Sequence, residues 1–170
     1  MKKAALLASI VLFATTFLAG IASAQWTFQA NLSGLGENPP NASPGFGLGT
    51  VVLDAGQTNI TVDLNWSGLT APATASHIHT GGVGTNGPVT FPFAGVPAAT
   101  AGAIPTQTFS ITPTQVTDLF AGNLYMNVHT LTFPGGEIRG QLILVPEPST
   151  VALVGLGLLG LGWRLRRRRR

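Results

Sequence analysis

Residues 60–66 read Ile-Thr-Val-Asp-Leu-Asn-Trp, and this stretch decides the fold because apolar and polar side chains alternate at every position. Successive side chains of a β-strand point to opposite faces, so the alternation predicts a strand with one buried face and one face in water. A turn-like segment at residues 54–57 precedes it, and residues 47–53 before the turn are again strand-like. Together these segments predict a β-hairpin.

The same type of segment recurs along the chain between positions rich in Gly, Pro and Asn. Further strands are predicted at residues 26–32, 74–80, 88–93, 106–111, 123–130 and 137–145. One short helix interrupts the pattern, because Thr112 suits its N-cap, Pro113 its first position and Gln115 a capping box. Many short strands with turn residues between them predict an all-β chain, folded as a single Greek-key-like β-sandwich with one short helix.

The N-terminus has the three parts of a secretion signal. Lys2 and Lys3 precede an apolar run at residues 4–21, and Ala22-Ser23-Ala24 follows as a small-residue cleavage site. We therefore expect signal peptidase to cut after Ala24, which makes residues 1–24 a signal peptide. A transmembrane helix that stays in place is the alternative, but the small residues before the site and the polar chain after it argue against this.

The C-terminus combines a proline motif, an apolar run and a basic cluster. Pro146-Glu147-Pro148 is followed by apolar residues 151–163 and then by arginines that include Arg166 and Arg167. Lysine and arginine favour the cytoplasmic side of a membrane. At about 1.5 Å per residue, the apolar run covers roughly 20 Å of a hydrocarbon core that is about 30 Å thick. Such a short span favours a temporary stop in the membrane over a plain anchor, although snorkelling arginines would extend it.

This tail closely resembles the PEP-CTERM sorting signal of Gram-negative bacteria that secrete exopolysaccharide. The resemblance implies that an exosortase processes residues 146–170 near Pro146, Glu147 and Pro148. It also implies export across the inner membrane, transient anchoring through residues 151–163, and delivery to the cell envelope or the extracellular matrix.

Between the two signals, residues 25–145 form one acidic domain. Arg139 is the only cation there, against five carboxylates, which leaves a net charge of −4. Nucleic-acid binding needs a basic surface, so the charge excludes this class of partner. The chain has no cysteine, which excludes disulfides and thiolate metal sites.

Three histidines are the candidate metal ligands. His77 and His79 project from the same face of one predicted strand, and His129 lies on another. If the two strands are neighbours, the imidazoles converge into a copper or zinc site with an open position. The alternative is that they only pack at a sheet edge, with Glu137 as a hydrogen-bond partner. Glu137 and Arg139 are expected to form an exposed ion pair, which would add little stability.

Three motifs resemble the CHRD domain, the module named after chordin. They are Leu35-Gly36-Glu37-Asn38-Pro39-Pro40, Ala75-Ser76-His77-Ile78-His79, and Asn127-Val128-His129-Thr130 with Phe133 to Leu142. The resemblance implies a β-sandwich of the immunoglobulin or Cu/Zn superoxide dismutase type with no established catalytic activity. The histidines are also faintly similar to the copper ligands of those dismutases. However, the bridging histidine, the further zinc ligands and the disulfide of that family are missing.

Two functional hypotheses follow. The first is an exported, non-enzymatic module with an adhesive or structural role, whose partner is a matrix polysaccharide or protein. The second is a copper- or zinc-binding or redox protein that uses His77, His79 and His129. No enzyme constellation supports a third, because the domain carboxylates are scattered and neither a nucleophile elbow nor a phosphate-binding loop is present.

Overall fold

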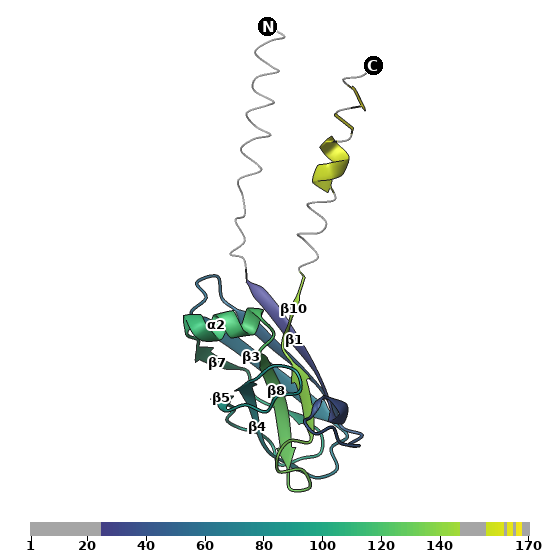
Figure 1. Cartoon of the computed structure of the whole chain (residues 1–170), viewed down its shortest axis with the longest axis vertical. Helices are drawn as coiled ribbons and strands as arrows, with labels where there is room; N and C mark the ends of the chain where they lie inside the picture. The colour runs from purple at the N-terminus through teal and green to yellow at the C-terminus, as the bar shows by residue number, and fades with distance from the viewer. Residues whose placement is uncertain (1–24, 147–155, 162, 165, 168–170) are drawn as a thin grey trace.

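A computed structural model of the chain describes residues 25–146, 156–161, 163–164 and 166–167 (Figure 1). The predicted signal peptide with Ala24 lies outside the described residues, as do Glu147 and Pro148. The described domain is mostly β-strand, and its antiparallel sheet curls until its two halves face each other. The predicted all-β sandwich with one short helix is thereby confirmed.

The strands form one sheet in the order β5-β4-β8-β9-β1-β2-β3-β6, with β10 paired to β1 and β7 paired to β3. Their bounds are β1 (Trp26–Ser33), β2 (Phe46–Leu53), β3 (Asn59–Ser67), β4 (Ala73–Thr80), β5 (Val89–Pro92), β6 (Gly102–Ala103), β7 (Gln107–Ser110), β8 (Leu124–Thr130), β9 (Ile138–Gln141) and β10 (Ile143–Val145). The helices are the 3₁₀ turn η1 (Gly34–Gly36) and α2 (Pro113–Phe120).

The predicted hairpin is the pair β2–β3, in which Val51 lies opposite Val62. Asp54 closes its turn, because the carboxylate accepts hydrogen bonds from the backbone N–H groups of Thr58 at 2.8 Å and Asn59 at 3.2 Å. Val51, Val62 and the other inward residues of the pair are buried. The alternation seen in residues 60–66 therefore does separate a core face from a solvent face.

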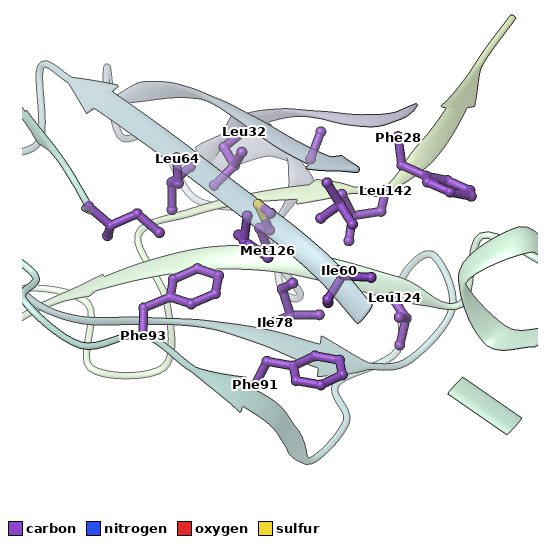
Figure 2. Close-up of a cluster of buried hydrophobic side chains, with 14 of the residues drawn as sticks. Phe28, Leu32, Ile60, Leu64, Ile78, Phe91, Phe93, Leu124, Met126 and Leu142 are labelled. Carbon is purple, nitrogen blue, oxygen red and sulfur yellow. The ribbon is translucent and has the colours of Figure 1, made fainter. Parts of the chain in front are cut away.

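The core lies between the two layers of the curled sheet, where Figure 2 shows the apolar side chains gathered. Gly49 on β2 marks how closely the layers approach. A Cβ at this position would overlap the sulfur of Met126 on β8, so the buried Met126 side chain would have to move to make room for it. β8 itself is positioned by its pairing with β4 on one side and β9 on the other.

Helix α2 begins as the sequence predicts. The Thr112 hydroxyl accepts from the Gln115 backbone N–H at 3.3 Å, and the Gln115 side chain accepts from the Thr112 N–H at 2.9 Å, which completes the capping box. Val116 and Leu119 are buried, and Phe120 packs edge-to-face on Phe28. The helix closes one end of the sandwich (Figure 1).

In the C-terminal tail, residues 156–161 are helical, and the Arg167 guanidinium lies 4.1 Å from the centre of the Trp163 ring. Within the described part of the chain, no helix has the length and apolar character needed to cross a membrane. The transmembrane helix expected at residues 151–163 therefore stays a prediction.

Candidate metal centre

The register between β4 and β8 brings the three histidines to one face of the sheet. His77 lies opposite Asn127, and His129 lies opposite Ala75, so His129 is the diagonal neighbour of His77. The ring centroids are 5.0 Å apart for His77 and His129, and 5.4 Å apart for His77 and His79. One ring nitrogen from each histidine lies within 4.8 Å of the other two. The two strands are neighbours, as convergence of the imidazoles required.

Backbone carbonyls hold two of the rings from outside. His79 Nδ1 lies 2.9 Å from the carbonyl oxygen of Gly87, and His129 Nδ1 lies 2.9 Å from that of Pro134. A carbonyl oxygen only accepts, so both Nδ1 atoms carry the proton and both Nε2 atoms are acceptors; that of His129 faces His77 Nδ1, and that of His79 has no donor among the described residues. This is the arrangement that orients histidine ligands in metal sites, where the second ring nitrogen donates to a carbonyl or a carboxylate.

His77 completes the group from the centre of β4. Its Nδ1 lies 3.2 Å from the Nε2 of His129. The pKa of His77 is lowered to about 4, mainly by burial and in addition by charge repulsion from the neighbouring His129 and His79. Burial also lowers the pKa of His129, although the hydrogen bond to Pro134 acts in the opposite direction. These two imidazoles are therefore neutral at neutral pH, which is the form that binds metals.

One ligand atom has no partner. His79 Nε2 is buried, and within the described residues nothing donates a hydrogen bond to it. A buried acceptor without a donor is unfavourable, because water can no longer solvate its lone pair. A metal ion at the point where the three rings converge would satisfy this nitrogen.

Tyr125 and Arg139 support the centre, a role that the sequence did not predict for either residue. The Tyr125 ring stacks on His79 at 4.9 Å, and the Arg139 guanidinium lies 3.4 Å from the centre of the Tyr125 ring. Arg139 also donates hydrogen bonds to the carbonyls of Gly82 at 2.9 Å and Thr85 at 3.0 Å. It therefore holds the loop at residues 81–88, which presents the Gly87 carbonyl to His79. The alternation of side chains along the strand assigned Arg139 to one face of the sheet. Nothing in the sequence indicated that Arg139 would bind the loop at residues 81–88.

The expected exposed pair of Glu137 and Arg139 is wrong. Both side chains are buried, and Glu137 instead accepts hydrogen bonds at 2.6 Å from Ser43 Oγ, Thr70 N and Thr130 Oγ1. Burial raises the pKa of Glu137, but these hydrogen bonds outweigh it and the net pKa is lowered. Glu137 lies just before β9 begins. The side-chain alternation of the strand therefore does not include Glu137, and this residue does not share a face with Arg139. It is also not the partner of any histidine.

A cleft of about 340 Å³ lies next to the centre, and Glu37, Asn86 and Pro134 are among the residues that line it. Glu37 is buried, and burial raises its pKa to about 7 although the charge of Arg139 acts in the opposite direction. Pro134 connects the two sites, because its carbonyl receives the His129 hydrogen bond.

The predicted processing residues lie apart from the histidines. Pro146 directly follows β10, while Arg166 and Arg167 belong to the helical part of the tail. Ala24, Glu147 and Pro148 lie outside the described residues. The structure thus brings together the three histidines of the site prediction, while the described processing residues Pro146, Arg166 and Arg167 lie elsewhere in the chain.

Comparison with known families gives two matches. A family model described as the CHRD domain matches residues 28–142, which includes all three histidines and most of the chain. A second model, described as the PEP-CTERM protein-sorting motif, matches residues 144–169. No curated protein matches the chain in sequence. Both resemblances seen in the sequence are confirmed.

Proposed function

The chain belongs to the CHRD domain family, and on this premise we propose that it is an envelope-sorted module that binds one copper or zinc ion through His77, His79 and His129. The sorting itself follows from the PEP-CTERM motif, which implies export and processing by an exosortase. The metal-binding role rests on the chemistry of the histidines.

The observation that carries the proposal is the convergence of three ring nitrogens within 4.8 Å of one another. Carbonyls hold two of the rings by their outer nitrogens, so the inner lone pairs are preorganised. Three neutral imidazoles fill three positions around Zn²⁺ or copper and leave one position open. If the histidines only packed at a sheet edge, there would be no reason for His79 Nε2 to be buried without a hydrogen-bond donor.

The proposal is for a binding protein, not an enzyme. An adhesive or structural role at the envelope is compatible with it and remains a separate prediction, with a matrix polysaccharide or protein as the expected partner. The two roles can be distinguished, because an adhesive module would keep its partner after the metal is removed.

We expect the full-length chain, purified in detergent and stripped of metal, to bind one equivalent of Cu²⁺ or Zn²⁺ in a competition titration. His129→Ala should weaken the affinity at least 100-fold, because it removes one of three ligands. Asn65→Ala is the matched control, since Asn65 is exposed on the outer face of β3 and should leave the affinity unchanged.

Absence of stoichiometric binding by the unmodified chain would contradict the proposal. The histidines would then only serve packing, and the search would turn to matrix polysaccharide and protein partners.

A further inference from the structure

The outer face of β8 carries a second buried acceptor beside the histidines. Asn127 is only 2% exposed, and within the described residues its Oδ1 has no hydrogen-bond donor. The residue lies directly opposite His77 in the register and two positions before His129, so all three side chains belong to the same face. No pattern along the chain indicated a role for Asn127 at the centre.

Among the described residues, two buried acceptors on this face have no hydrogen-bond donor, His79 Nε2 and Asn127 Oδ1, and the two differ in what they can bind. A nitrogen lone pair suits a metal ion, whereas an amide oxygen accepts a hydrogen bond. An ion bound by three histidines keeps one position open, and a ligand there that carries a hydrogen would satisfy Asn127. An apolar residue at position 127 would avoid the cost of burying an unpaired amide oxygen, so the amide has no evident packing advantage.

We infer that Asn127 selects the ligand at the open position of the histidine centre. Its Oδ1 accepts a hydrogen bond from a small protic ligand, which is water in the resting protein and otherwise a neutral group with an O–H or N–H. Anions without a hydrogen are disfavoured, because they cannot donate a hydrogen bond to Asn127 Oδ1. This inference rests on the proposed metal-binding function and adds the class of ligand to it.

The charges around the centre agree with this selectivity. Arg139 is the only cation of residues 25–145, and its guanidinium donates to the carbonyls of Gly82 and Thr85 and to Asn86 Oδ1. It also lies behind the Tyr125 ring as seen from His79. Arg139 lies directly opposite Asn127 in the β8–β9 register, but these three hydrogen bonds go to the loop, which leaves Asn127 as the hydrogen-bonding group offered to a ligand.

The test uses the full-length chain loaded with Cu²⁺, once its stoichiometry has been measured. Azide, an anion without a hydrogen, is titrated while its charge-transfer band is recorded. Electron–nuclear double resonance in H₂O and D₂O detects the exchangeable protons of the protic ligand. We expect Asn127→Leu to bind Cu²⁺ within about threefold of the unmodified chain, to bind azide at least tenfold more tightly, and to shift the exchangeable-proton couplings of the bound water, while those of the imidazole N–H groups stay unchanged.

Asn127→Asp keeps an acceptor at the same place, so it should keep the exchangeable-proton couplings of the bound water and bind azide more weakly still. It also keeps the test decisive if Asn127→Leu fails to fold. Asn65→Leu, a substitution on the outer face of β3, is the control and should leave both readouts unchanged.

Unchanged azide affinity in Asn127→Leu would overturn the inference and leave the metal site intact. A tenfold or greater loss of Cu²⁺ affinity in that variant would also overturn it, because Asn127 would then be a metal ligand itself. Absence of copper binding by the unmodified chain would instead remove the proposed function and this inference with it.

Discussion

At the residue scale, the histidine centre depends on which nitrogen of each ring faces inward. Parity along the strand places His77 and His79 on one face, but the carbonyls of Gly87 and Pro134 decide where the protons lie. These carbonyls belong to loop residues. Each one fixes which nitrogen of its histidine carries the proton, and therefore which nitrogen could bind a metal ion.

The two groups with the clearest pKa shifts give opposite pH dependences. The pKa of His77 is lowered from 6.5 to about 4 in the folded protein. As the pH of a metal-free solution falls, the unfolded chain is therefore protonated at His77 before the folded chain is. The stability due to neutral His77 is complete above pH 6.5 and is lost as the pH falls toward 4. The pKa of Glu37 is raised from 4.5 to about 7, so its contribution is complete below pH 4.5 and is lost as the pH rises through 7.

Glu37→Gln should therefore remove the loss of stability between pH 4.5 and 7 and make the metal-free protein more stable than the unmodified chain at about pH 8. The physical reason is that glutamine is never ionised and needs no burial of charge. Urea unfolding at several pH values measures this, with Asp118→Asn as the control for loss of one negative charge. Parallel stability curves for Glu37→Gln and the unmodified chain would refute the expectation.

At the element scale, the loop between β4 and β5 is a structural part of the centre. Arg139 binds its carbonyls, Tyr125 Oη accepts from the Gly87 N–H at 3.2 Å, and Asn38 Nδ2 donates to the Gly84 carbonyl at 2.8 Å. The loop is thus held against the outer face of the sheet at several points. The position of this loop determines the orientation of the His79 ring, because the Gly87 carbonyl accepts the hydrogen bond from His79 Nδ1.

Gly87 is the position where this loop tolerates no side chain, because a Cβ there would overlap the Thr80 carbonyl. We expect Gly87→Ala to destabilise the protein by about 1–3 kcal/mol, the usual cost of overpacking, and to weaken metal binding by displacing the carbonyl that orients His79. Calorimetric unfolding and a copper titration measure the two effects.

Gly135→Ala is the matched control for this change. Gly135 lies in the loop before β9, and an added Cβ would meet nothing within 4 Å there, so both readouts should stay unchanged. Equal stability of the two alanine variants would show that the β4–β5 loop adapts and does not position His79.

At the scale of the whole molecule, the chain enters and leaves the domain at the same end. Thr27 on β1 lies opposite Val145 on β10, so both terminal segments attach side by side (Figure 1). Pro146, the first residue of the proline motif, directly follows β10. Removal of both the signal peptide and the tail would leave residues 25–145 with their net charge of −4.

We expect the released protein to lack residues 153–170, because the exosortase is expected to act near Pro146-Glu147-Pro148. Intact-mass analysis of protein from the producing cell measures this. Replacement of Glu147 by alanine is the control and should retain the arginines, if the motif is what the enzyme recognises. A released protein that still carries all five terminal arginines would contradict the prediction.

The sequence by itself determined the local and compositional properties of this protein. Alternation in residues 60–66, the capping box at Thr112 and the absence of cysteine depend only on neighbours along the chain and on composition, so the order of the amino acids is enough to establish them. The CHRD and PEP-CTERM motifs are recognisable for the same reason, since each is made of contiguous patterns.

Tertiary structure alone decided the site. His77 and His129 are far apart in the chain, and only the β4–β8 register makes them neighbours. The sequence states which face each residue occupies but not which strand lies beside it, because pairing depends on how the whole sheet closes around its core. The buried position of Arg139, the loop that it holds and the unpartnered oxygen of Asn127 are consequences of that closure.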